Sequence, residues 1–382
     1  MHPNVHTNAI KKWAGLSING TTPAIIHSPA GLGFPRLSDV YFESHCMAYA
    51  RTMVKGDKHV TRAHALNSKL DRESQWVRKM GKYGSRQWQQ TFTSASNVSG
   101  TQTWSKIKPE IKTIIYDNRK KYWQDYIQPL LQQGSLLKLL HLQVYDLTWR
   151  SLIYNLPRGV LSFAVRASID FLPTFSNLRT WGKRTTDKCK LCGNKETLSH
   201  VLNSCPVSVE QGRLTWRHNT ILYHIINRFK SSFNSFSVYA DLPGHSSGGG
   251  TIPPDIIITN LKPDMVLLHN DGKSIQLVEL TVPFETNTDK AHDRKTSKYS
   301  QLAQDLEEKG FKCHLICIEI CSRGLISNDN VQRLQSLFQA NRTQLKTLRE
   351  ELSRLALLSS YTIWNARHNA VWENCPYMYI KC

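Results

Sequence analysis

Two carboxylates and two lysines between residues 262 and 310 have the types and the spacing needed to cut a phosphodiester bond. Asp264 opens an apolar run, and a second apolar run at 275–278 leads into Glu279. The Asp271-Gly272 pair between the runs favours a two-residue hairpin loop of type I′. Counting outward from this loop places Asp264 opposite Glu279, and opposed residues have Cβ atoms about 4.5–5.5 Å apart on one face.

Carboxylates this close repel each other unless a cation lies between them, and a site made of oxygen ligands suits Mg²⁺. The next segment predicts a helix that ends at Lys309-Gly310 and carries Lys295 on its apolar stripe, with Lys298 at the edge of that stripe. Because leucines bury the stripe against the sheet, we expect the lysines to lie over the hairpin. A strand at 311–320 would complete a strand–helix–strand crossover, which favours parallel pairing.

These residues fit metal-assisted phosphodiester cleavage. Asp264 and Glu279 would hold Mg²⁺, while Lys295 or Lys298 would stabilise the developing negative charge. Asp255 is a rival carboxylate, but it does not pair with Glu279 in the hairpin register. The alternative is two acids at strand ends, beside lysines that only flank a core helix.

The strongest short motif is Cys189-x2-Cys192-x7-His200-x4-Cys205. Two cysteines separated by two residues direct both thiolates toward one ion, and the histidine and the third cysteine complete a tetrahedral Cys₃His set. All four ligand positions are then filled by protein atoms, so the motif predicts a structural zinc ion. The alternative is three unrelated core thiols, which the spacing disfavours.

The chain has 382 residues, which allows two or three domains, and a formal net charge of +20. Residues 1–185 carry 26 basic and 10 acidic side chains, against 23 and 19 in residues 186–382. A basic first half suits a polyanion-binding platform joined to a catalytic unit. The nine cysteines favour a reducing compartment, and the absence of a long apolar run predicts no membrane partner.

A helix predicted at 104–133 carries cations interleaved with rings at Arg119, Lys120, Lys121, Tyr122 and Trp123, as surfaces that bind nucleic acid do. A core helix with a solvated basic face explains this run equally well. Arg217-His218-Asn219 opens a further helix, and we assign Arg217 and His218 to nucleic-acid binding as well. His218 is more often structural or phosphate-contacting than catalytic.

With these residues identified, the chain resembles the C-terminal part of the reverse transcriptase/endonuclease polyprotein of non-LTR retrotransposons, of the class that inserts into ribosomal DNA. The resemblance rests on Pro263-Asp264, Glu279-Leu280-Thr281, Lys295-x2-Lys298-Tyr299 and the zinc motif that precedes them. Ala9–Leu37 is similar to the thumb of that family, and Phe163–Trp181 to its basic linker. Two departures are Thr281, where simpler restriction enzymes have lysine, and Glu279, where family members often have aspartate.

The resemblance implies a mixed α/β fold with a helical basic N-terminal half, a zinc knuckle and a PD-(D/E)xK-like nuclease core with a mixed sheet flanked by helices. It divides the chain into a thumb-like remnant (1–60), a basic helical linker (61–185), the knuckle (186–215) and a restriction-like endonuclease domain (216–382). The implied activity is Mg²⁺-dependent nicking of target DNA in the nucleus to prime reverse transcription, with element RNA as a second candidate partner. The polymerase palm is missing, so no polymerase activity is expected. The alternative is an inactive nucleic-acid-binding remnant of the same element. The oligomeric state stays open.

Overall fold

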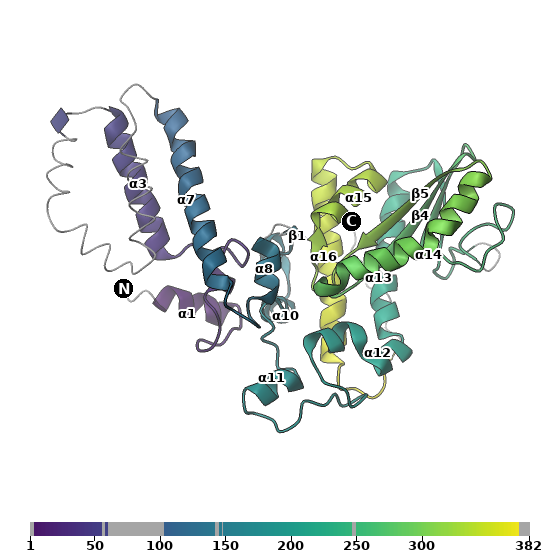
Figure 1. The fold of residues 1–382 in the computed structure, drawn as a ribbon, viewed down its shortest axis with the longest axis horizontal. Helices are drawn as coiled ribbons and strands as arrows, with labels where there is room; N and C mark the ends of the chain where they lie inside the picture. The colour runs from purple at the N-terminus through teal and green to yellow at the C-terminus, as the bar shows by residue number, and fades with distance from the viewer. Residues whose placement is uncertain are drawn as a thin grey trace. The chain divides into compact units, whose positions relative to one another are not determined.

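The computed structural model describes residues 4–55, 58–59, 103–141, 145–146, 148–246 and 250–373. The chain divides into two compact units, Met1–His141 and Leu142–Cys382 (Figure 1). Residues 61–102, the first part of the predicted basic linker, lie outside the described residues. The boundary between the units falls inside that predicted linker, while the four-part division of the chain stays a prediction.

Helices make up the described part of the first unit: α1 (Asn4–Trp13), α2 (Ala24–His27), α3 (Leu37–Lys55), α7 (Trp104–Ile127) and α8 (Ser135–His141). Helix α7 buries Ile107, Ile111, Ile115, Trp123 and Ile127, which recur with the helical period. The helix predicted at 104–133 is therefore present but ends at Ile127.

The second unit begins with short helices that lead to the zinc motif and the sheet. They are α9 (Thr148–Ser151), η1 (Ile153–Asn155), α10 (Arg158–Ser168), α11 (Phe175–Thr180), η2 (His200–Ser204) and α12 (Pro206–Glu210). The longer elements are α13 (Arg213–Ser232), η3 (Glu285–Asn287), α14 (Thr288–Glu308), α15 (Asn328–Phe338) and α16 (Arg342–Asn365). Strands β1 (Tyr145–Asp146) and β6 (Ile326–Ser327) form a small antiparallel pair.

The main sheet has four strands in the order β2-β3-β4-β5: β2 (Phe236–Ala240), β3 (Met265–His269), β4 (Ser274–Thr281) and β5 (Lys312–Glu319). Strands β2, β3 and β4 pair antiparallel, whereas β4 and β5 pair parallel through the α14 crossover. The mixed α/β fold and the parallel crossover are therefore confirmed.

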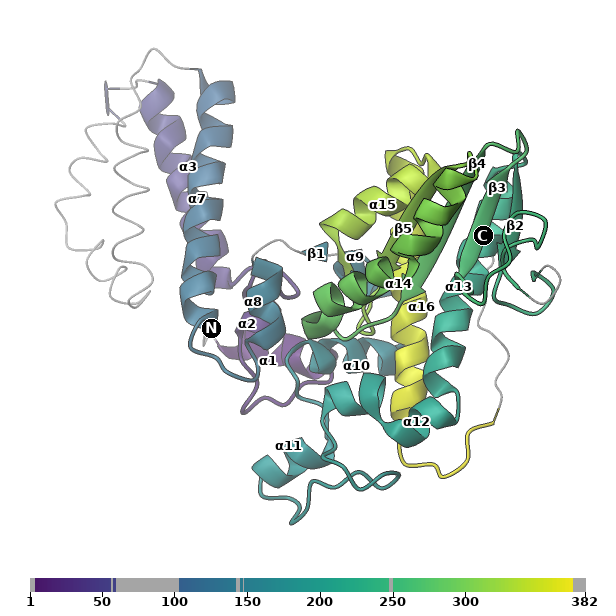
Figure 2. The same cartoon turned by 45° about the vertical axis from the view of Figure 1, so that its right-hand side comes forward.

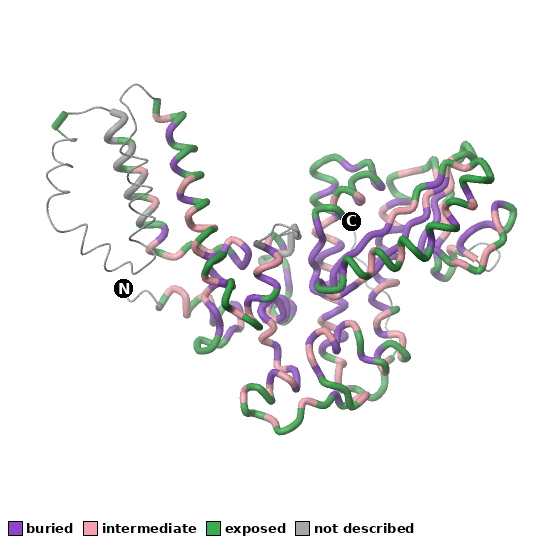
Figure 3. The backbone as a smooth tube through the Cα atoms, in the orientation of Figure 1, coloured by how far each residue is buried: buried purple, intermediate pink, exposed green. Residues whose placement is uncertain are grey.

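Helices cover both faces of this sheet, with α14 on one face and α13 and α16 on the other (Figure 2). Alternate residues of β4 pack on opposite sides: Ile275 and Leu277 contact the α14 layer, while Val278 and Leu280 contact the α13–α16 layer. Figure 3 shows the strands as mostly buried and the outer side of α14 as exposed. The sheet is therefore the centre of two hydrophobic layers.

The β3–β4 hairpin has the predicted register but a different turn. Met265 pairs with Val278 and Leu268 with Ile275, as the count from the turn required. A type I′ loop needs positive φ at both central residues. Here Gly272 has φ of 67°, Asp271 is not among the residues with positive φ, and the Gly272 N–H donates to the His269 carbonyl at 2.9 Å. The predicted type I′ turn was therefore wrong, although its register was right.

Within the described ranges, no helix combines the length and the apolar composition that a membrane crossing needs.

Candidate carboxylate and zinc sites

The open end of the β3–β4 hairpin brings two carboxylates together. Asp264 immediately precedes β3, and its backbone N–H donates to Glu279 Oε1 at 3.1 Å. Asp264 Oδ2 in turn accepts from the Leu280 N–H at 2.8 Å. The Glu279 side chain is fully buried and that of Asp264 is 12 % exposed. The structure thus places these two predicted residues in contact, next to solvent only on the Asp264 side.

Helix α14 supplies one of the two predicted lysines. Lys295 Nζ lies 3.5 Å from Asp264 Oδ2 and donates a hydrogen bond to Glu279 Oε2. Lys298 instead donates to the Tyr299 hydroxyl at 2.9 Å, and Tyr299 donates to the Lys262 carbonyl at 2.8 Å. Lys295 is therefore the lysine that reaches the carboxylates. The rival Asp255 is exposed.

His218 of α13 joins this cluster from the other helix layer. Its Nε2 atom lies 3.3 Å from Asp264 Oδ2 and 3.1 Å from the Leu280 carbonyl oxygen, while Nδ1 contacts Asn219 Oδ1 at 2.9 Å. No periodic pattern in the sequence predicts this placement, because it depends on how α13 packs against the end of the sheet. Asp264, Glu279, Lys295 and His218 are hereafter called the carboxylate cluster.

The two carboxyl groups of the cluster titrate far apart. Burial alone would raise the pKa of Asp264, but the hydrogen bond and charge of His218, the charge of Lys295 and the Leu280 N–H lower it to about 2. Burial and the Asp264 charge raise the pKa of Glu279 to about 7, against the opposing effect of Lys295. Near neutral pH Asp264 is therefore ionised, and Glu279 beside it is only partly ionised even with Lys295 in contact.

The two cationic groups respond to the same neighbours. Burial would lower the pKa of Lys295, but the charges of Asp264 and Glu279 raise it above the ordinary lysine value. Burial likewise opposes a charge on His218, yet the hydrogen bond and charge of Asp264 raise its pKa above the ordinary histidine value. Both residues therefore favour their charged forms beside the carboxylates.

The cluster brings together oxygen atoms of the chemical type that binds hard divalent cations. Asp264 Oδ2 and the Leu280 carbonyl oxygen both lie close to His218 Nε2, and Lys295 Nζ joins Asp264 Oδ2 to Glu279 Oε2. Carboxylate and carbonyl oxygens are ligands that Mg²⁺ and Ca²⁺ accept. An amine that bridges the two acids marks the place where positive charge is stabilised.

The four zinc-motif residues converge as the spacing predicted. The ligand atoms of Cys189, Cys192, His200 and Cys205 all lie within 4.8 Å of one another, and Cys192 Sγ is 3.3 Å from His200 Nε2. Zn–S and Zn–N bonds of about 2.3 and 2.0–2.1 Å in a tetrahedron require ligand separations of roughly 3.5–3.8 Å, so the set fits a zinc ion. The chain turns at Gly193, directly after Cys192, where φ is 74° and the N–H donates to the Cys189 carbonyl at 2.9 Å.

This knuckle packs on the rest of the second unit. Leu198, Val201 and Leu202 share a core with Phe163 of α10 and Trp364 of α16. The Asn203 side-chain amide also donates to the Val282 carbonyl at 2.7 Å, directly after β4. The zinc motif therefore contacts the chain directly after the strand that carries Glu279.

Arg217 is not available to nucleic acid. It is 1 % exposed, and its guanidinium donates to Ser360 Oγ at 3.1 Å and to the Val282 carbonyl at 3.2 Å. Its assignment to nucleic-acid binding was wrong, because α13 turns this side chain into the protein.

Trp123 was also wrongly assigned. It is 1 % exposed and stacks on His27, with ring centroids 6.2 Å apart. Arg119 forms ion pairs with Asp39 and Glu43, at 3.8 and 3.4 Å. In the predicted run 119–123, Lys121 is exposed, whereas Arg119, Lys120 and Tyr122 are half-buried, so Lys121 is the residue of this run that faces solvent.

Fold and sites together define a mixed α/β chain with a Cys₃His knuckle and a carboxylate cluster at a hairpin end. Residues 135–211 match a family model described as zinc-binding in reverse transcriptase. This match contains all four residues of the zinc motif, so it supports a structural zinc ion and a retrotransposon-related protein. It ends before Asp264. No curated protein matches the chain.

Proposed function

We propose that the chain is a Mg²⁺-dependent endonuclease that nicks target DNA, as the C-terminal part of a non-LTR retrotransposon polyprotein of the ribosomal-DNA-inserting class. The observation that carries the proposal is the contact of Asp264 with Glu279 under the Lys295 amine. The strand–helix–strand arrangement around these residues agrees with a PD-(D/E)xK-like core. The reverse-transcriptase zinc match immediately upstream supports the same type of element.

In this proposal the residues of the cluster divide the work. Asp264, Glu279 and the Leu280 carbonyl would hold Mg²⁺, which would polarise the scissile phosphate and lower the pKa of an attacking water. The Lys295 amine meets negative charge that develops on the phosphoryl oxygens. His218 keeps Asp264 oriented through its Nε2–H. Cleavage of the P–O3′ bond leaves the 3′ hydroxyl that primes reverse transcription.

Binding of the substrate would draw on the basic first half of the chain. The excess positive charge lies in residues 1–185, and Lys121 on α7 is one of its exposed groups. Such charge attracts DNA or the element RNA through phosphate contacts that weaken steeply with salt. Action on chromosomal DNA places the proposed activity in the nucleus.

The test is nicking of supercoiled plasmid by the full chain and by Asp264→Ala, with Mg²⁺ and with EDTA. We expect the parent to nick only with Mg²⁺, and the variant to retain DNA while losing nicking. Asp255→Ala is the matched control, because this exposed carboxylate lies outside the cluster and its loss should leave the rate unchanged. Equal nicking by the parent and Asp264→Ala would refute the proposal.

A second candidate is an inactive nucleic-acid-binding remnant. It is favoured by one observation: the Lys295 amine already compensates the two carboxylates, so the cluster is electrostatically satisfied without a metal ion. This alternative predicts salt-sensitive DNA binding and no Mg²⁺-dependent product at any protein concentration. The plasmid assay above separates the two candidates.

A further inference from the structure

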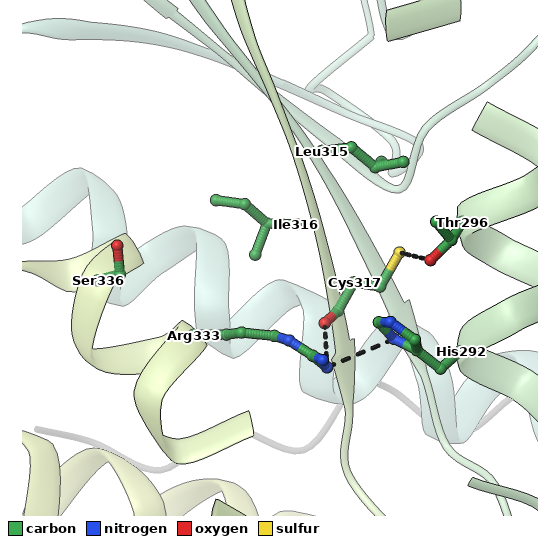
Figure 4. A pocket seen from close by; sticks show the side chains of 7 residues that line it. All are labelled: His292, Thr296, Leu315, Ile316, Cys317, Arg333 and Ser336. Carbon is green, nitrogen blue, oxygen red and sulfur yellow. Dashed lines mark hydrogen bonds between the residues drawn. The ribbon is translucent and has the colours of Figure 1, made fainter. Parts of the chain in front are cut away.

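A pocket with a mixed polar and apolar lining lies at the outer edge of β5, one strand away from Glu279. It has a volume of about 320 Å³ and is lined by His292, Thr296, Leu315, Ile316, Cys317, Arg333 and Ser336, from α14, β5 and α15 (Figure 4). Cys317 is the parallel partner of Glu279 in the β4–β5 ladder. Adjacent strands lie about 4.8 Å apart, so the pocket opens beside the carboxylate cluster.

A buried carboxylate contacts both His292 and Arg333 in this pocket. Glu319 is 2 % exposed; its Oε1 lies 3.0 Å from His292 Nδ1, and its Oε2 accepts from Arg333 Nη1 at 3.0 Å. Arg333 Nη1 also donates to the Cys317 carbonyl at 3.2 Å and to Asn330 Oδ1 at 3.3 Å. All these contacts involve Nη1, so they anchor that end of the guanidinium beside Glu319.

The Nε and Nη2 atoms of Arg333 form the opposite edge of the guanidinium, which carries two N–H donors that these contacts do not use. Among the described residues, none accepts from Arg333 Nε or Nη2, and His292 Nε2 has no partner. Arg333 is 31 % and His292 32 % exposed, so both reach the pocket mouth. A guanidinium edge with two parallel N–H groups matches two oxygens of a phosphate. Ser336 adds a hydroxyl to the lining, whereas the Thr296 hydroxyl contacts Cys317 Sγ at 3.7 Å.

From this geometry we propose that the pocket binds a backbone phosphate of the DNA strand next to the phosphate that is cut. This inference rests on the proposed nuclease function. One turn of α14 directs Lys295 to the carboxylates and His292 and Thr296 to the pocket, so a single helix holds both phosphates in register. The bound phosphate would therefore be one that flanks the scissile phosphate on the same strand.

The test is a double-mutant cycle between Arg333 and single phosphates. Duplexes that carry one neutral methylphosphonate at successive positions around the cut are bound to the zinc-loaded full chain in Mg²⁺-free buffer, and dissociation constants are measured. For the parent, we expect one flanking position to weaken binding about tenfold when neutralised. For Arg333→Gln, unmodified DNA should bind about tenfold more weakly, the salt slope should fall by about one, and that position should cause no further loss.

Two further variants separate recognition from folding. Arg333→Lys keeps a charge beside Glu319 but has no two-donor edge, so it should fold like the parent and still lose the position-specific effect. Arg228→Gln is the matched control: Arg228 is 25 % exposed, pairs with Glu351 at 3.2 Å, and lines a separate pocket of about 290 Å³. It should leave the methylphosphonate profile unchanged. Arg333→Lys or Arg333→Gln with the parent's profile would overturn the inference, as would an equal effect of Arg228→Gln.

Because binding is measured without Mg²⁺, the result for the pocket does not depend on whether the chain cuts DNA. A parent that never nicks plasmid but keeps the coupling between Arg333 and one phosphate refutes nicking and retains the pocket. A parent that nicks normally, with no phosphate position coupled to Arg333, retains the nuclease and refutes the pocket.

Discussion

Replacing Lys295 with methionine isolates the electrostatic role of the amine in the carboxylate cluster. Methionine keeps the length of the side chain and most of its packing, but leaves Asp264 and Glu279 buried without their shared cation. Removing one partner of a buried ion pair costs about 3–5 kcal/mol. Asp264 keeps its contact with His218, and Glu279 can take up a proton because its pKa is about 7. We therefore expect the lower end, about 3 kcal/mol at pH 8.

The assay is thermal unfolding of the zinc-loaded chain in Mg²⁺-free buffer, followed by titration with Mg²⁺. For a unit of the size of Leu142–Cys382, a loss of about 3 kcal/mol lowers Tm by about 6–12 °C. A cation that binds the folded cluster should restore about 2.7 kcal/mol at a hundred times its Kd. The parent should gain less, because Lys295 already supplies positive charge there.

Lys298→Met is the matched control for this experiment. Lys298 lies one turn further along α14 and contacts the Tyr299 hydroxyl, with no contact to either carboxylate. Its loss should change stability by less than about 1 kcal/mol and should not create a response to Mg²⁺. Equal destabilisation by the two variants, or no recovery of Lys295→Met with Mg²⁺, would refute the reasoning.

Two further predictions concern a proton and the zinc ion. The pKa of Glu279 rises from 4.5 to about 7 on folding, so its contribution to stability is complete below about pH 4.5 and is lost as pH rises through 7. In Mg²⁺-free buffer, the Tm of Glu279→Gln should therefore rise relative to the Tm of the parent between pH 5 and 8. Cys192→Ser should lower the zinc content from one ion per chain, measured by atomic absorption, and should slow plasmid nicking by at least tenfold. Cys313→Ser, at a buried thiol outside the zinc motif, should change neither the zinc content nor the nicking rate.

Each of these has a clear opposite result. A Tm difference that stays constant from pH 5 to 8 would show that Glu279 is ionised throughout and that the buried pair carries two charges. Full zinc content in Cys192→Ser would remove that thiol from the ligand set. Normal nicking by a zinc-free variant would show that the knuckle does not support the carboxylate cluster.

The parts of the site that the sequence predicted are those set by local rules. The register of the hairpin follows from the two apolar runs and the number of residues between them. The predicted register is right although the predicted turn type is wrong, because Gly272 alone supplies the positive φ that the turn needs. The zinc ligands follow from the geometry of a two-residue spacing between cysteines. Lys295 follows from the helical period, which also places Tyr299 on the buried face of α14.

The residues that the sequence did not place are set by packing between distant elements. His218 reaches Asp264 only because α13 lies across the end of the sheet, and Glu319 gathers His292 and Arg333 only because α14 and α15 flank the edge of β5. Trp123 was misassigned for a related reason. A ring beside lysines looks the same in sequence whether it faces solvent or, as here, another helix.

Arg217 and His218 act together at the end of β4, which gives Arg217 a role other than binding DNA. Adjacent on α13, they donate to the Val282 and Leu280 carbonyls, the positions on either side of Thr281. Burial lowers the pKa of Arg217 to about 10, against the raising effect of Glu285, so the guanidinium stays charged at neutral pH. Asn203 of the zinc knuckle shares the Val282 carbonyl. The backbone that carries Glu279 is therefore held by both α13 and the zinc knuckle. Loss of zinc would remove the Asn203 contact to Val282 and so loosen the support of the carboxylates, although no knuckle residue contacts them directly.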